Sequence, residues 1–151
     1  MRAPSAAVIL GDLIRGFAGM HRALILIVDS KVESRHWLWR HLGNHGFGVL
    51  EAPNADCALR WIDERPDIDA MIIDDELVDG RGAEIARELS QEQHPIAERA
   101  VVIASEWRRV MLSGLHVVER GDIESLMSTL SKWFAPSAPR RAAQPQAMDA
   151  R

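Results

Sequence analysis

Acidic residues directly follow two strongly apolar stretches of this chain. Asp29 follows Ala23–Val28, and the three acids at positions 74–76 follow Ile68–Ile73. Carboxylates that lie close together repel one another and raise each other's pKa, so a fold that clusters them supplies a cation or a proton. Mg²⁺ binds through one or two carboxylates, and a carboxylate beside it can act as a nucleophile that accepts a phosphoryl group. Each acid taken alone is better explained as a solvated residue at the end of a strand.

The stretches that would position these acids alternate between two types. Five are short apolar runs, typical of strands in a parallel sheet: Ala23–Val28, Phe47–Glu51, Ile68–Ile73, Ala100–Ala104 and Leu115–Val118. Helical patterns lie after Ser30 and over Asn54–Ile62, Gly82–Leu89 and Ile123–Phe134. Asn54 is a predicted helix cap, as is Ser30 with Glu33 three residues later. The alternation predicts a doubly wound α/β fold with a five-stranded parallel sheet. Asp29 and Asp74 then converge at one sheet edge if the first and third strands are neighbours.

Composition sets limits on what the chain can do. Its 151 residues are 47% hydrophobic and 26% charged, with a net charge of −4. This length can bury a core without metals or disulfides, and the single cysteine, Cys57, excludes an internal disulfide. The chain has neither a long basic run nor an apolar run of about 20 residues. We therefore expect no binding to nucleic acid or membrane, and a cytoplasmic location.

The ends of the chain differ from its middle. We expect a leader over residues 1–21, one domain over 22–134, and a disordered tail over 135–151, which is rich in Ala, Pro, Gln and Arg. The leader is either poorly ordered or a short helix that docks on the domain or on a partner. Four of its apolar residues could share one helical face: Val8, Leu13, Ile14 and Phe17.

Three motifs together resemble the receiver domain of response regulators, and the resemblance runs from about residue 23 to residue 134. The motifs are Leu26–Ser30, Ile72–Gly82 and Val117–Leu126. The second is the most specific, because receivers place their phosphoacceptor Asp at the end of the third strand and a glycine eight positions later. Here Asp74 and Gly82 have that spacing. The resemblance implies a flavodoxin-like receiver fold.

The resemblance also implies roles for individual residues. Asp74 matches the phosphoacceptor, and Asp29 matches the first acid of the pair that holds Mg²⁺. The metal ligands would be Asp29, Asp74 and the main-chain carbonyl of Glu76. His116 matches the aromatic switch position on the fifth strand, although a half-buried edge residue is an equally good interpretation.

Three pocket positions depart from the receiver pattern. Ser30 replaces the second acid of the pair, so Mg²⁺ binding should be weak or absent. Ala104 stands where receivers have a hydroxyl residue, and side-chain alternation should turn Ser105 away from the pocket. Glu119 stands where receivers have the lysine that pairs with the phosphoacceptor, so it should repel Asp74 or turn outward.

Two further expectations follow from these departures. Three cations are candidates to replace the missing lysine: Arg120, Lys31 and Arg81. The segment available for the fourth helix, 106–114, allows only about two turns. The partner surface there should be altered, with Trp107 and Met111 as candidate contacts, although we expect Met111 to pack inward. In the first predicted helix, Trp37 and Trp39 cannot both face the core, so at least one should be exposed.

The sequence leaves three functional hypotheses open. The first is an atypical single-domain response regulator that takes a phosphoryl group from a histidine kinase or phosphotransfer protein. It would not be an enzyme, and it would signal to a downstream protein as a monomer or weak homodimer. The second is a pseudo-receiver that binds partners without phosphorylation. The third, less favoured because no general acid or base has an evident partner, is a small Mg²⁺-dependent phosphatase or other hydrolase.

Overall fold

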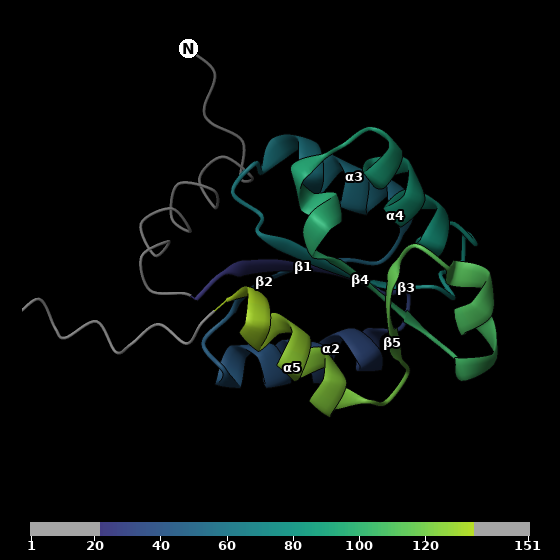
Figure 1. The fold of residues 1–151 in the computed structure, drawn as a ribbon. Coiled ribbons are helices and arrows are strands. Elements are labelled where there is room, and N and C mark those ends of the chain that lie inside the picture. The colour runs from purple at the N-terminus through teal and green to yellow at the C-terminus, as the bar shows by residue number, and fades with distance from the viewer. Residues whose placement is uncertain (1–21, 135–151) are drawn as a thin grey trace, which may run out of the picture.

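The computed structural model describes residues 22–134, which form one α/β domain (Figure 1). Its elements, in chain order, are β1 (Leu24–Val28), α2 (Val32–Asn44), β2 (Gly48–Ala52), α3 (Ala55–Glu64), β3 (Ala70–Asp74), α4 (Gly82–Gln91), the 3-10 helix η1 (Pro95–Arg99), β4 (Ala100–Ala104), the 3-10 helix η2 (Glu106–Leu112), β5 (His116–Glu119) and α5 (Ile123–Trp133). The expectations for residues 1–21 and 135–151 lie outside the described residues.

The five strands form one parallel sheet in the order β2-β1-β3-β4-β5. This confirms the predicted doubly wound fold, with strand ends that differ from the predicted ones by at most two residues. Because the order reverses between β1 and β3, the carboxyl ends of these strands flank the crevice where such folds bind ligands. No helix within residues 22–134 is long and apolar enough to cross a membrane.

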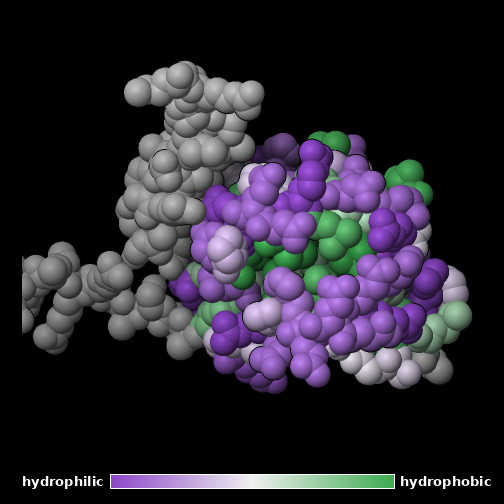
Figure 2. All heavy atoms as spheres, turned by 90° about the horizontal axis from the view of Figure 1, so that it is seen from above, coloured by the Kyte–Doolittle hydropathy of each residue, from purple (hydrophilic) through white to green (hydrophobic). Residues whose placement is uncertain are grey.

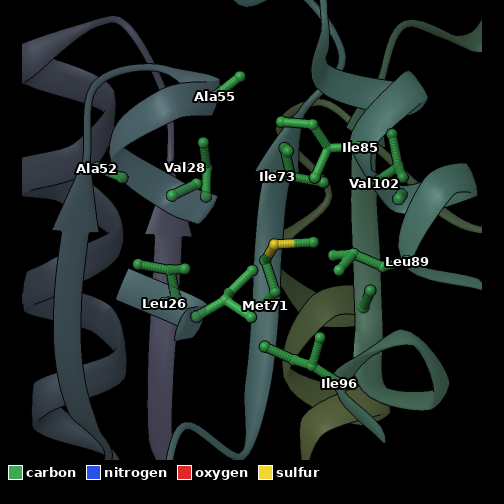
Figure 3. Close-up of a cluster of buried hydrophobic side chains, with 14 of the residues drawn as sticks. Leu26, Val28, Ala52, Ala55, Met71, Ile73, Ile85, Leu89, Ile96 and Val102 are labelled. Carbon is green, nitrogen blue, oxygen red and sulfur yellow. The ribbon is translucent and has the colours of Figure 1, made fainter. Parts of the chain in front are cut away.

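Two layers of helices cover the sheet. Helices α3 and α4 lie on one face, and α2 and α5 on the other (Figure 1). Alternate residues of each strand feed the two cores: Leu26, Met71 and Ile73 point toward α3 and α4 (Figure 3), whereas Ile25 and Ile72 belong to the core on the other side. Because helices cover both faces of the sheet, both sides of each central strand are buried, and the strand sequences are apolar almost without interruption. The outer surface over α3 and α4 is mostly hydrophilic around a central apolar area (Figure 2).

Of the two predicted helix caps, Asn54 is confirmed and Ser30 is not. The side chain of Asn54 caps α3 by accepting a hydrogen bond from the amide of Cys57 at 2.8 Å, as predicted. The predicted cap at Ser30 is wrong. The N-cap residue of α2 is Lys31, one position later, and its side chain makes no capping hydrogen bond. The hydroxyl of Ser30 instead accepts a hydrogen bond from the amide of Val78, at 3.0 Å.

The segment between β4 and β5 contains no α-helix in the described structure. Seven residues of this segment, Glu106–Leu112, form the 3-10 helix η2, which agrees with the predicted shortening. The other 3-10 helix, η1, was not predicted; it begins with Pro95 after a cap by His94. The expectation for Met111 is wrong: its side chain is 64% exposed, and Trp107 beside it on η2 is 69% exposed.

Candidate functional site

The carboxyl ends of β1 and β3 bring the two predicted acids together. Val28 pairs with Ile73 in the parallel register, so Asp29 and Asp74 are the next residues along two neighbouring strands. Both carboxylates are buried, with 4% and 3% of the residue exposed. Burial of two acids at one sheet edge requires a compensating charge, and the structure supplies it from the residue that follows β5.

That charge is the guanidinium of Arg120. Its Nη1 donates to Oδ2 of Asp74 at 2.5 Å, and its Nη2 donates to Oδ1 at 2.9 Å. The same Oδ1 also accepts a hydrogen bond from the amide of Glu76 at 2.7 Å. The hydrogen bond to Asp74 raises the pKa of Arg120, and the charges of Asp74, Glu76 and Asp29 act in the same direction. Of the three candidate cations, Arg120 is therefore the one that lies on the acid cluster.

The other two candidate cations lie elsewhere. Lys31 is exposed at the start of α2. Arg81 is engaged by the acids of two helices: its guanidinium lies 3.4 Å from Asp56, 4.0 Å from Glu84 and 3.9 Å from Glu88.

The donor set of this pocket fits Mg²⁺ poorly. Both oxygens of Asp74 are bound by Arg120, and Oδ1 of Asp29 accepts a hydrogen bond from the amide of Lys31 at 2.9 Å. Among residues 22–134, no three Asp, Glu, His or Cys side chains are grouped so that they could hold a metal ion. A divalent ion would have to displace a guanidinium that already neutralises the carboxylate. The expected ligand role of the Glu76 carbonyl stays a prediction.

The substituted positions around the pocket lie as follows. Ala104 is buried at the end of β4 and offers no hydrogen-bonding side chain. Ser105 is half-buried, and its hydroxyl makes no cap hydrogen bond to η2. Glu119 is exposed, paired across the sheet with Ala104, and Arg120 extends the ladder by donating its amide to the carbonyl of Ala104 at 2.9 Å. The side chain of Glu119 thus turns to solvent, and the guanidinium of Arg120 binds Asp74.

A third buried acid in this region, Asp75, is paired with a different arginine. Asp75 is 4% exposed, and its Oδ2 lies 2.5 Å from Nε of Arg108 on η2. Burial raises the pKa of Asp75, and the charge of Arg108 opposes that shift. This ion pair was not predicted from the sequence. Three consecutive acids at positions 74–76 cannot all face one pocket. If a neighbour of Asp74 is buried, it therefore needs a cation from another element, and this reasoning could have predicted the need for an arginine near Asp75.

The loop after β3 is fixed by a glycine and an aspartate. A Cβ at Gly82 would lie 2.1 Å from the carbonyl oxygen of Asp74, so only glycine allows α4 to start there. This contact gives a physical reason for a glycine eight positions after Asp74. Oδ2 of Asp79 accepts a hydrogen bond from the amide of Ala55 at 3.0 Å, and Oδ1 accepts one from the amide of Arg81 at 3.2 Å. The loop is therefore tied to the start of α3.

The remaining predicted residues lie on the surface. His116 is exposed, with its ring edge-on to Trp133 at 5.5 Å between centroids and its Nε2 3.3 Å from the hydroxyl of Thr129. Its role as a switch stays a prediction. Trp37 and Trp39 on α2 are 43% and 51% exposed, so neither is buried in the core.

Comparisons with known proteins show which structures share this fold. No protein-family model and no curated protein matches the chain. A Thermotoga maritima response regulator, TrrA, in complex with Mg²⁺ and BeF is similar in structure, with a TM-score of 0.60 and 24% identity over 73% of this chain and 97% of that one. A Pseudomonas putida response regulator receiver protein has a TM-score of 0.63 and 20% identity over 74% and 97%. The Vibrio cholerae chemotaxis protein CheY4 has a TM-score of 0.60 and 18% identity over 73% and 97%. The described part of this chain therefore has the flavodoxin-like fold of response regulator receiver domains.

Proposed function

We propose that this chain is an atypical response regulator of two-component or phosphorelay signalling, with Asp74 as its phosphoacceptor. The observation that carries the proposal is the position of Asp74: buried at the carboxyl end of β3, beside Asp29, with the guanidinium of Arg120 on its carboxylate. The phosphoryl donor is a histidine kinase or a phosphotransfer protein. The protein works in the cytoplasm, as a monomer or weak homodimer, and transmits the signal through contacts with a downstream protein.

The transfer balances in atoms and charge. One carboxylate oxygen of Asp74 attacks the phosphorus of a phosphohistidine, an O–P bond forms, the N–P bond breaks, and the imidazole leaves with a proton from solvent. The product carries its negative charge on the phosphoryl oxygens, near the former carboxylate. A guanidinium binds phosphate in the same two-pronged way as carboxylate, so Arg120 can follow the charge from one to the other. No turnover of substrate is involved, so we do not class the protein as an enzyme.

A second function is supported by the same ion pair. Arg120 already occupies both oxygens of Asp74, Ala104 offers no hydroxyl, and Ser30 adds no carboxylate. A pocket neutralised in this way can hold one conformation without phosphorylation. The chain would then be a pseudo-receiver, a constitutive binding module with the same fold.

Phosphoryl uptake separates the two functions. The full chain is incubated with a phosphohistidine donor or acetyl phosphate, with and without Mg²⁺, and its intact mass is measured. The proposal expects a gain of one phosphoryl group that Asp74→Asn abolishes and that Asp75→Asn, the matched control at the neighbouring acid, retains. In addition, Ser30→Asp restores a carboxylate beside Asp29 and should raise both Mg²⁺ affinity and uptake, because ligand charge sets the affinity of oxygen sites. Absence of uptake with every donor would select the pseudo-receiver, and steady release of phosphate would indicate a hydrolase.

A further inference from the structure

A groove of about 500 Å³ lies far from the acid pocket, at the open edge of the sheet. One wall is the last part of α2, with Trp39, Arg40 and Gly43, and the other is formed by Phe47 and strand β2. Strand β2 ends the sheet order, so no strand covers its outer side in the described structure. None of the residues of the acid pocket lines this groove.

The groove is open because its lining lacks side chains where they would fill it. A Cβ at Gly43 would meet nothing within 4 Å. Beside it, Trp39 leaves 51% of its surface exposed. An indole at the wall of an open groove gains free energy when apolar side chains cover it. The groove therefore has the form of an acceptor for an apolar segment.

The covalent continuation of the chain leaves the domain at this groove. The amide of Arg22 donates to the carbonyl of Gly46 at 2.9 Å, and Gly46 lines the groove. Arg22, which is joined to residues 1–21, therefore lies at its rim. From Arg22 back to Phe17 are five residues, which can span up to about 17 Å. This length lets Phe17 reach the groove that begins beside Arg22.

The sequence of that segment has the pattern that such a groove accepts. Four large apolar residues have the spacing i, i+3, i+4, i+7 of one helical face: Leu10, Leu13, Ile14 and Phe17. Asp12 and Arg15 fall on the opposite side of the same helix. A helix this short, interrupted by glycines, is marginal in water by itself and gains stability only by burying its apolar face. Groove and segment thus complement each other.

We propose that residues 10–17 dock as a helix in the groove between α2 and β2 of the same chain, covering Trp39. The site is intramolecular and independent of Asp74, so an experiment that refutes this contact does not refute the proposed function, and the reverse also holds. Docking places a second helical layer at the β2 edge and closes the one strand edge on this side of the sheet that is otherwise free to pair with other chains.

The test compares point variants of the full chain by NMR. The chain has five tryptophans, and the indole peak of Trp39 is assigned as the one lost in Trp39→Phe. A soluble nitroxide broadens exposed indoles. We expect weak broadening of Trp39 in the native chain and in Arg15→Gln, a control on the polar face, and at least a twofold increase in Leu13→Asp/Phe17→Asp. The indole of Trp107, exposed on η2, should broaden equally in all three. Because the substituted residues lie outside residues 22–134, the sheet amides report whether the fold is retained.

A reciprocal variant tests the groove itself. Gly43→Leu fills open space without a clash, and it should move the amide shifts of Leu13 and Phe17 to random-coil values while the sheet is unchanged. Equal broadening of Trp39 in all variants would overturn the proposal. So would protection of Trp39 that disappears on dilution, because it would assign the groove to a second copy of the chain. Neither result would affect phosphoryl uptake at Asp74.

Discussion

Removal of the guanidinium from the acid pocket tests whether Arg120 takes the place of a metal ion. The substitution Arg120→Met retains much of the apolar stem but leaves Asp74 buried beside Asp29 without a cation. Loss of one partner from a buried ion pair costs about 3–5 kcal/mol of unfolding free energy. Because 32% of the Arg120 side chain is exposed, water can reach the vacated position, so we expect the lower limit, about 3 kcal/mol.

Urea unfolding measures this loss. With a urea dependence of about 2 kcal/mol per M for a domain of this size, the midpoint should fall by about 1.5 M. Arg60→Met is the matched control, because it removes the same charge from an exposed position of α3. This variant should keep the native midpoint within the usual range of surface substitutions, about 0.5 kcal/mol.

Mg²⁺ should then act on the variant and not on the native chain. In Arg120→Met the two carboxylates are free to bind a cation. With a Kd of about 1 mM, about 10 mM Mg²⁺ would return roughly 1.4 kcal/mol by mass action. The comparison is made against NaCl at equal ionic strength. If the variant is as stable as the native chain, Arg120 does not neutralise the pocket; if Mg²⁺ stabilises both equally, the guanidinium does not exclude the ion. Either result refutes the reasoning.

Two further substitutions test the positioning of the site. Gly82→Ala puts a Cβ 2.1 Å from the carbonyl oxygen of Asp74, so we expect the free energy of unfolding, measured in urea, to fall by about 2–3 kcal/mol. Gly43→Ala, with open space around it, should raise the free energy of unfolding by up to about 1 kcal/mol. Equal effects of the two substitutions would contradict the contact at Gly82. At the start of α5, hydrogen bonds from the hydroxyl and then the amide of Ser125 lower the pKa of Asp122. This contribution is complete above the ordinary aspartate pKa of about 3.9 and is lost as the pH falls through the lower folded value. Asp122→Ala should therefore lower Tm at pH 7 and lose its effect in acid, and a Tm difference that does not vary with pH would argue against the cap.

The sheet and its order could be predicted because parallel strands buried on both faces leave a strong pattern. The runs 24–28 and 70–73 are apolar throughout, and the helices between the strands carry one-sided patterns. Local caps are less certain, since they compete with distant partners. The Ser30–Glu33 pattern predicts a capping box, but the hydroxyl of Ser30 is used by the amide of Val78, 48 residues away. A bond between two loops has no periodicity from which sequence reasoning could find it.

The Asp75–Arg108 pair shows the same limit at the site. Whether an acid at a strand end is buried depends on how the following elements pack, and η2 is a short irregular segment without a helical pattern. Physical reasoning requires only that a buried Asp75 have a cation. The identity of that cation is fixed by the path of the segment after β4, which the sequence does not specify.

The cation of the main pocket allows a stronger conclusion. Two adjacent buried carboxylates need a positive charge whatever the motif at the end of β5, so the requirement itself could be derived from Asp29 and Asp74 alone. Alignment of motifs put Glu119 in the place of that charge and predicted repulsion or an outward turn. The structure shows the outward turn and a cation one residue later, where the strand has ended and side-chain alternation no longer restricts direction. A receiver pocket can therefore lose its lysine position and retain its charge balance, because the charge within reach of the carboxylate, and not its place in the motif, sets the electrostatics of Asp74.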